Sequence, residues 1–157
     1  MEKILLNEKD LLLLEKLQLN CKKSLKQLAN EVGMPMSTVH EKINKFERTG
    51  IIKAYRAILD EKKLDFSVTA FIMACTEYIG GEKTFQHNIG EKVASLPQVL
   101  ETHTISGDWD LLIKVKFKNV HELGKFVNER IRTIKGITKT VTLVSIDEIK
   151  EDTFLKL

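Results

Sequence analysis

Long apolar stretches are missing from this 157-residue chain. No run approaches the about 20 apolar residues that a transmembrane helix needs, so we expect no membrane span. The first ten residues, MEKILLNEKD, contain neither an apolar core nor a small-residue cleavage site, which argues against a signal peptide. The two cysteines, Cys21 and Cys75, lie on unrelated segments, and this favours a reducing interior over a disulfide scaffold. We therefore expect a cytoplasmic protein.

Patterns of catalytic and metal-binding residues are also missing. The four histidines are scattered, and no C-x-x-C or H-x-x-x-H spacing occurs, so a zinc site is not expected. No G-K-[ST] follows a glycine-rich loop, and no G-x-S-x-G motif is present, so neither a phosphate loop nor a nucleophile elbow is predicted. We predict a non-enzymatic protein with no catalytic residue, no metal and no cofactor.

Positive charge is concentrated in the first part of the chain. Residues 1–63 contain 13 Lys or Arg and 9 Asp or Glu, and residues 22–56 contain 8 and 3. The remaining residues are close to neutral. A basic part beside a neutral part indicates one segment that binds a polyanion and one with a different task, although a solvated basic surface would give the same counts.

Two short helices joined by a tight turn are predicted within residues 24–50. Ser24 and Gln27 form a capping box, and Gly33 is suited to end that helix in a left-handed conformation. Pro35 is suited to the first turn of a second helix, which we expect to run to about Thr49. Paired helices with such a turn indicate a helix-turn-helix, although an amphipathic helix with an ordinary wet surface remains the alternative.

The second of these helices has an apolar face and a polar, basic face. Val39, Ile43 and Phe46 recur at helical spacing, and the polar residues lie opposite them. Such a helix fits the major groove of DNA, with its first turns at base edges and later cations near phosphates. We predict base contacts from Ser37, Thr38, His40, Glu41 and Asn44, and phosphate contacts from Lys42, Lys45, Arg48, Lys53 and Arg56.

A period-2 pattern from Ile51 to Leu59 predicts a strand that leaves the helical part as a wing, with Lys53 and Arg56 available to phosphates. The charged stretch 60–65 follows. We therefore place a DNA-binding domain at residues 1–59, a linker at 60–66 and a second domain at 67–157.

The second domain shows the order βαββαβ, typical of a ferredoxin-like fold, so the chain is predicted to be an α+β protein. Two helices can cover only one face of a four-stranded sheet, yet residues 67–76 are apolar on both faces. A second copy of the same domain would cover the other face. We therefore expect a two-fold homodimer, and DNA half-sites spaced by it.

Four segments resemble the leucine-responsive (Lrp/AsnC, or feast/famine) regulator family: SLKQLANEVG, STVHEKI, RTGIIKAYRAILD and SGDWDLLIKVKF. The similarity spans nearly the whole chain. It implies a winged helix-turn-helix transcriptional regulator that pairs through its sheets and often assembles dimers into larger rings, such as tetramers or octamers. One departure stands out: the family often has Ser-Pro before STV, whereas Pro35-Met36 precedes it here, so the start of the recognition helix is where we expect a difference.

The turn from Ser106 to Asp110 is a candidate effector site. Gly107 permits a positive φ and Asp108 is a common turn residue, so an ordinary hairpin turn is one interpretation. In the other interpretation, Asp108 and Asp110 accept hydrogen bonds from the ammonium group of a ligand, and the backbone near Gly107 binds its carboxylate. The resemblance implies that this turn and two threonines of the last strand form an amino-acid pocket. The matching residues are Ser106, Gly107, Asp108, Asp110, Thr140 and Thr142. The threonines are equally compatible with ordinary strand positions.

We conclude from the sequence that the chain is a sequence-specific transcriptional regulator that binds double-stranded DNA and responds to an amino acid or related metabolite. Two alternatives remain open. One is a small-molecule-binding assembly module whose helical domain contacts protein instead of DNA. The other is an enzyme on the ferredoxin-like domain, for which no catalytic constellation was found.

Overall fold

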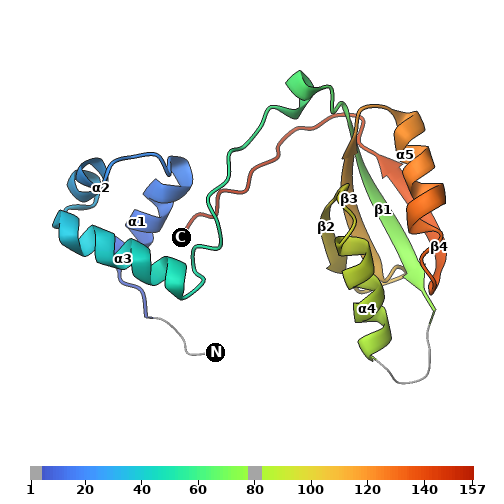
Figure 1. Ribbon diagram of the computed structural model, residues 1–157, viewed down its shortest axis with the longest axis horizontal. Helices are drawn as coiled ribbons and strands as arrows, with labels where there is room; N and C mark the ends of the chain where they lie inside the picture. The colour runs from blue at the N-terminus through green and yellow to red at the C-terminus, as the bar shows by residue number, and fades with distance from the viewer. Residues whose placement is uncertain (1–4, 78–82) are drawn as a thin grey trace. The chain divides into compact units, whose positions relative to one another are not determined.

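The computed structural model describes residues 5–77 and 83–157 of the chain (Figure 1). They form two compact units: residues 1–58 with 150–157, and residues 59–149. We call them the helical unit and the sheet unit. The expected boundary near residue 59 lies close to this division, but the last residues, 150–157, belong to the helical unit and not to the sheet unit.

Helices α1 (Glu8–Leu19) and α2 (Leu25–Val32) begin at capping boxes. The Asn7 side chain accepts a hydrogen bond from the Asp10 backbone N–H at 2.9 Å, and the Asp10 carboxylate accepts one from the Asn7 N–H at 3.1 Å. Ser24 and Gln27 make the equivalent pair at α2. Gly33 ends α2 with φ of 66°, a conformation that a side chain would strain.

Helix α3 (Met36–Arg48) begins one residue later than expected from the sequence. Pro35 is its N-cap and not its first helical residue, and no side chain caps this end. At the other end the Thr49 hydroxyl donates to the Lys45 carbonyl at 2.7 Å. The three helices enclose one apolar core, in which Val39 and Phe46 of α3 are buried together with the following side chains: Leu13, Leu14, Leu17, Leu28, Ala29 and Val32.

The segment after α3 is not the predicted strand. No strand is present between Ile51 and Leu59, a stretch that the structure describes in full. At its start the Ile52 N–H donates to the Phe46 carbonyl at 3.1 Å and Ile51 packs beside the core. A strand needs a hydrogen-bonding partner, and the period-2 pattern cannot supply one. A short 3₁₀ helix, η1 (Glu61–Leu64), follows.

The C-terminal segment 150–157 docks on α1. The Gln18 side-chain amide donates to the Leu155 carbonyl at 2.9 Å and accepts from the Leu155 N–H at 2.8 Å. The Glu15 carboxylate accepts from the Leu157 N–H at 3.0 Å. One glutamine side chain thus pairs with both backbone groups of Leu155, as a neighbouring strand would, and fixes the segment to the helical unit.

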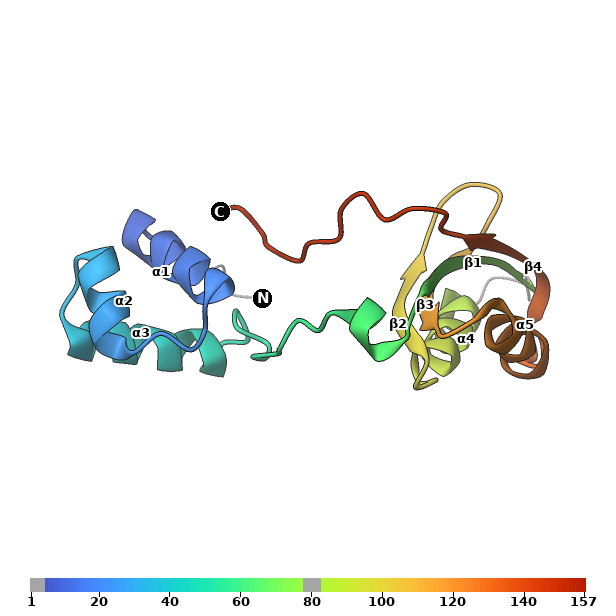
Figure 2. The same ribbon diagram turned by 90° about the horizontal axis from the view of Figure 1, so that it is seen from above.

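The sheet unit confirms the predicted βαββαβ order. Its elements are β1 (Val68–Thr76), α4 (Lys83–Ala94), β2 (Val99–Thr104), β3 (Leu111–Phe117), α5 (Val120–Phe126) with the π turn η2 (Val127–Ile131), and β4 (Ile137–Val144). The strands form one antiparallel sheet in the order β2-β3-β1-β4. Figure 2 shows α4 and α5 on the same face of the curved sheet.

Strand alternation separates a covered and an open face. Ala70, Ile72 and Ala74 of β1 point to the helices and join a core with Ile89 of α4 and Phe126 of α5. The opposite side chains form what we call the open face, which no element of the sheet unit packs across in the described residues. Its apolar members are half-buried or exposed: Phe71, Met73, Cys75, Leu112, Val141 and Leu143.

The open face also contains charges, and two of them, Lys114 and Lys116 of β3, are paired with glutamates. Lys116 of β3 is only 6% exposed in its side chain, and its ammonium lies 3.0 Å from a Glu61 oxygen and 3.5 Å from a Glu148 oxygen. Lys114 lies 3.3 Å from Glu101, whose pKa is lowered, first by the hydrogen bond from His103 and then by Lys114.

A membrane-spanning helix would have to be long and apolar, and no helix in the described part of the chain has both properties.

Candidate nucleic-acid interface and effector residues

The outer face of α3 carries the residues predicted to contact DNA. Val39 and Phe46 are buried and Ile43 is half-buried, which turns the opposite face outward. Ser37, His40, Glu41, Asn44, Lys45 and Arg48 are exposed there, and Thr38 is half-buried. His40 and Asn44, one turn apart, approach to 3.4 Å between Nε2 and Nδ2, so these two candidate base contacts form one polar pair on the surface.

Four predicted phosphate contacts have uncompensated positive charge. Lys45, Arg48, Lys53 and Arg56 are exposed, and within the described residues none makes an ion pair. Elsewhere in the helical unit Lys16 and Lys23 bind Glu31, whereas Lys22 and Lys26 are exposed and make no ion pair within the described residues. The pKa of Glu31 is lowered, first by the Lys23 hydrogen bond. Four free cations therefore lie on α3 and the segment after it.

Lys42 is placed differently from the other predicted phosphate contacts. Its ammonium binds the carboxylate of Asp10, which is 5% exposed, and links the start of α1 to the middle of α3. Removing that cation would leave a buried carboxylate without its partner. The ion pair gives Lys42 a structural task in orienting α3, and this favours an internal role over a DNA contact.

Tyr55 fixes the segment that follows α3. Its hydroxyl donates to a Glu47 oxygen at 2.9 Å. Burial of the phenol raises the pKa of Tyr55 to about 12, and the Glu47 hydrogen bond and charge act in the same direction. Lys53 and Arg56 flank Tyr55 in the sequence, so this contact holds both of them beside the C-terminal part of α3.

The turn before β3 is anchored by Asp110. Its carboxylate accepts from the Thr76 backbone N–H at 2.7 Å, the Thr76 hydroxyl at 3.1 Å and the Gln86 side-chain amide at 3.1 Å. Asp110 therefore ties the turn to the end of β1 and to α4, with little acceptor capacity left for a ligand ammonium. Ser106, Gly107 and Asp108 are exposed, and Gly107 has φ of 121°.

The predicted effector residues fall into two groups within one chain. Thr140 and Thr142 stand opposite Ala74 and Ile72 of β1, so they point to the helix-covered face. The turn lies on the other side: the Cys75 thiol donates to the Asp108 carbonyl at 3.5 Å, and the Lys139 ammonium stands 4.9 Å from the Trp109 ring centroid. Because neighbouring strand residues point to opposite faces, one chain alone does not join the two groups into a pocket.

Three structural contacts had no signal in the sequence. The Asp10–Lys42 pair joins residues 32 positions apart, and Gln18 binds a segment 137 positions away. Arg132, at the end of the α5 helix, donates to the hydroxyl of Thr140. None of these pairs follows from local periodicity. Among the residues that the structure describes, no group of three or more metal-ligating side chains comes together.

Comparison with known proteins matches both units. A family model described as winged helix-turn-helix DNA-binding matches residues 6–53, and one described as Lrp/AsnC ligand binding domain matches residues 69–155. An HTH-type transcriptional regulator of Pyrococcus abyssi is 37% identical over 148 residues, which cover 94% of this chain and 97% of that protein. The leucine-responsive regulatory protein of Haemophilus influenzae is 30% identical, with 94% and 88% covered.

Solved structures show the same fold. Escherichia coli AsnC superposes with a TM-score of 0.86 at 26% identity, over 98% of this chain and 100% of that chain. A transcriptional regulator of Neisseria meningitidis, solved in complex with L-methionine, also gives a TM-score of 0.86, at 23% identity and with 96% of each chain covered.

Proposed function

The chain belongs to the Lrp/AsnC family of HTH-type transcriptional regulators, and on that premise we propose that it binds a specific operator in duplex DNA. In this proposal it binds as a homodimer or a larger ring, and an amino acid changes its affinity for the operator. The outer face of α3 is the observation that supports this proposal most. It combines short polar side chains near its N-terminus with uncompensated cations near its end. Polar groups of this kind recognise base edges, and the cations neutralise phosphates.

Base contacts are proposed for Ser37, Thr38, His40, Glu41 and Asn44 on α3. Phosphate contacts are proposed for Lys45 and Arg48 on α3 and for Lys53 and Arg56 after it. Lys42, which the sequence placed in the same set, is left out because it is bound to Asp10. A helical unit that contacted protein instead of DNA would favour aromatic and apolar side chains on this face, whereas α3 presents polar and charged ones.

Assembly is proposed to proceed through the open face. The half-buried apolar side chains of β1 and β3 on this face lack a cover in the described part of the chain, and their neighbouring lysines are already neutralised by glutamates. Packing the centres of two such faces together buries apolar area without leaving Lys114 or Lys116 unpaired. Two recognition helices would then read half-sites at a fixed spacing.

An amino-acid effector is proposed to bind at the turn 106–110 and the β4 threonines. The ligand-binding family match covers both groups, and a regulator of the same fold was solved with L-methionine. Because one chain places the turn and the threonines on opposite faces, the complete pocket would require residues from a neighbouring copy. The effector site and the assembly are thus expected to depend on each other.

Selection of bound DNA from a random pool, with and without a panel of free amino acids, tests operator binding and effector together. We expect an enriched pattern of two related half-sites, and a change in its spacing or affinity with one amino acid. Enrichment of no sequence at moderate salt would refute a specific operator. If a site is selected but no amino acid changes its spacing or affinity, the proposed effector is refuted and the proposed operator binding is not.

Replacing Lys45 or Arg48 by Met tests the phosphate contacts. Each change should weaken binding to selected and random DNA alike, because a phosphate contact is independent of sequence. Each should also reduce the slope of log affinity against log salt by about 0.9 for each subunit bound, because one phosphate contact is lost per subunit. Asn44→Ala is the matched change at a proposed base contact, and it should instead relax preference at one base pair with little change in slope. Unchanged mobility shifts would contradict the assignment.

A further inference from the structure

Arg132 ends the helical segment that covers β4. The π turn Val127–Ile131 widens the helix there, and the Arg132 N–H donates to the Val127 carbonyl at 2.9 Å. Its side chain extends toward the strand, where Nε donates to the Thr140 hydroxyl at 3.2 Å and Nη1 donates to the Asn128 amide oxygen at 3.2 Å. Two bonds therefore fix the plane and direction of the guanidinium.

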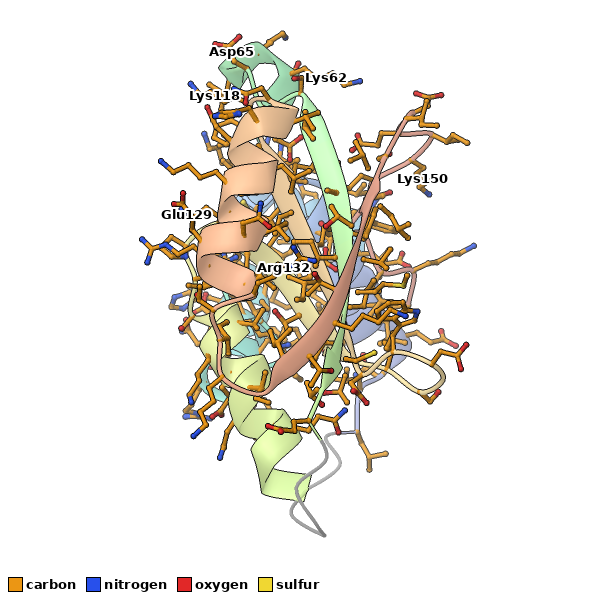
Figure 3. The ribbon with its side chains drawn as sticks, turned by 90° about the vertical axis from the view of Figure 1, so that its right-hand side faces the viewer. Lys62, Asp65, Lys118, Glu129, Arg132 and Lys150 are labelled. Carbon is orange, nitrogen blue, oxygen red and sulfur yellow. The ribbon has the colours of Figure 1, made fainter. Side chains whose placement is uncertain are left out.

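Both acceptors of Arg132 are neutral. Glu129 lies three positions earlier on the same helix, yet within the residues that the structure describes it forms no ion pair with Arg132. Figure 3 shows Glu129 on the outer side of α5 and Arg132 on the side of β4. The positive charge of Arg132 is oriented by its neighbours but not neutralised by them.

The groups around Arg132 have hydrogen-bond donors left over and few acceptors. Two of the five N–H donors of a guanidinium are used, which leaves the Nη2 group and one hydrogen on Nη1. The Thr140 oxygen accepts from Arg132, so its own hydrogen is available to another acceptor. The Asn128 oxygen also accepts from Arg132, and its NH₂ group remains a donor. Three neighbouring side chains thus offer donors, and one of them is cationic.

A donor-rich cluster around an oriented guanidinium selects an anion, and a planar carboxylate matches the guanidinium fork best. Thr140 is one of the proposed effector residues, and Thr142 faces the same side two residues along β4. We propose that Arg132, positioned by Asn128 and Thr140, binds a carboxylate of the effector. This proposal rests on the proposed effector function, and it adds the chemical class of the group that is bound.

Titration calorimetry of the full-length chain with glutamate, glutamine and leucine at neutral pH tests this proposal. Arg132→Met keeps the apolar stem and removes the charge, whereas Arg130→Met removes an exposed cation that has no partner in the described residues. Loss of a charge-assisted hydrogen bond should weaken binding about tenfold to hundredfold in the first variant, and the second should bind like the wild type.

The pattern of loss tells which carboxylate is bound. If Arg132→Met weakens glutamate alone and removes its advantage over glutamine, the guanidinium binds a side-chain carboxylate. If all three amino acids weaken equally, it binds the α-carboxylate. Either result supports the proposal, provided that thermal unfolding shows a folded variant. Arg132→Lys, which keeps a charge without the fork, should retain intermediate affinity and serves as the second variant if Arg132→Met is unfolded.

Two outcomes overturn the proposal, and they differ in meaning. Equal affinities of the wild type and the Arg132 variants, with at least one amino acid bound, would remove Arg132 from the site and leave the effector function intact. Absence of binding of all three amino acids to the wild type, together with no response of the selected operator to the amino-acid panel, would remove the effector function and the Arg132 proposal with it. DNA binding, measured separately by mobility shift, would stand in both cases.

Discussion

Lys45 and Arg48 on α3 face solvent and have no acidic partner among the described residues, whereas Lys114 and Lys116 on β3 are bound to glutamates. The apolar side chains of α3 and of the open face also differ in how far they are buried. On α3 Val39 and Phe46 are buried in the core, and on the open face of the sheet Phe71, Met73 and Leu112 are only half-buried.

This difference indicates two kinds of partner. A surface that binds a polyanion reversibly needs exposed cations. Each contact with a phosphate releases condensed counterions, and added salt therefore weakens it. A permanent protein contact needs apolar area and neutralised charges, since an unpaired buried charge would be destabilising. The helical unit fits the first description and the open face fits the second. Three substitutions test this difference.

The largest effect is expected from a charge placed on the open face. Met73→Asp should separate the subunits, because an unpaired carboxylate would lie in the buried centre of the proposed interface. Loss of the second half-site contact should lower operator affinity about a thousandfold, since linked binding contributes that order of avidity. Light scattering should report a monomer, and mobility shifts the lost affinity.

Val120→Asp is the control for this change. It also replaces an apolar residue by Asp, but Val120 is exposed at the first turn of α5, where a carboxylate suits the helix dipole. The control should remain oligomeric. A Met73→Asp protein that kept the wild-type mass and affinity would show that the open face is not the interface.

A smaller effect is expected from the ion pair inside the helical unit. Lys42→Met should lower the free energy of unfolding by about 2 kcal/mol, because it leaves the Asp10 carboxylate buried without its partner. Its salt slope should match the wild type, in contrast to Lys45→Met, which should change the slope and leave stability alone. Urea unfolding and salt-dependent mobility shifts measure both.

The double variant Asp10→Asn with Lys42→Met separates pairing from packing. It should recover part of the lost stability, because no charge is then left buried. A salt slope that fell as much in Lys42→Met as in Lys45→Met would mean that Lys42 contacts phosphate after all.

The smallest effect is expected at Tyr55 and only in alkali. Its neutral phenol donates to Glu47, and its pKa is raised to about 12 from an ordinary value of about 10. The stabilisation should be complete below pH 10 and lost as the pH rises to 12. The ultraviolet titration of the wild type minus that of Tyr55→Phe should show a midpoint near 12, and a midpoint near 10 would disprove the contact.

Periodic features were predictable from the sequence. Leu111, Ile113, Val115 and Phe117 alternate with Lys114 and Lys116, and the structure buries the apolar set against the helices, as period 2 requires. The inward face of α3 and the end of α2 at Gly33 were predictable for the same reason, because the spacing and the residue type determine them locally.

Features that depend on distant partners were not predictable. The pattern from Ile51 to Leu59 alternates like a strand, but no strand in the part of the chain that the structure describes pairs with it. Lys42 looked like a phosphate contact because the helical period places it beside the basic face, and only the fold brings Asp10 to it. Likewise, nothing near Thr140 in the sequence reveals that Arg132 binds its hydroxyl.

The contact between Gln18 and Leu155 has a consequence for the order of biosynthesis. A ribosome extends the chain from its N-terminus, so α1 to α3 emerge before the segment that docks on them. The sheet unit is translated between the two, so the helical unit lacks its last segment until residues 59–149 have been made. A nascent chain that has α3 but not yet Leu155 would therefore expose the Gln18 amide. The helical unit would be completed last, although most of it is translated first.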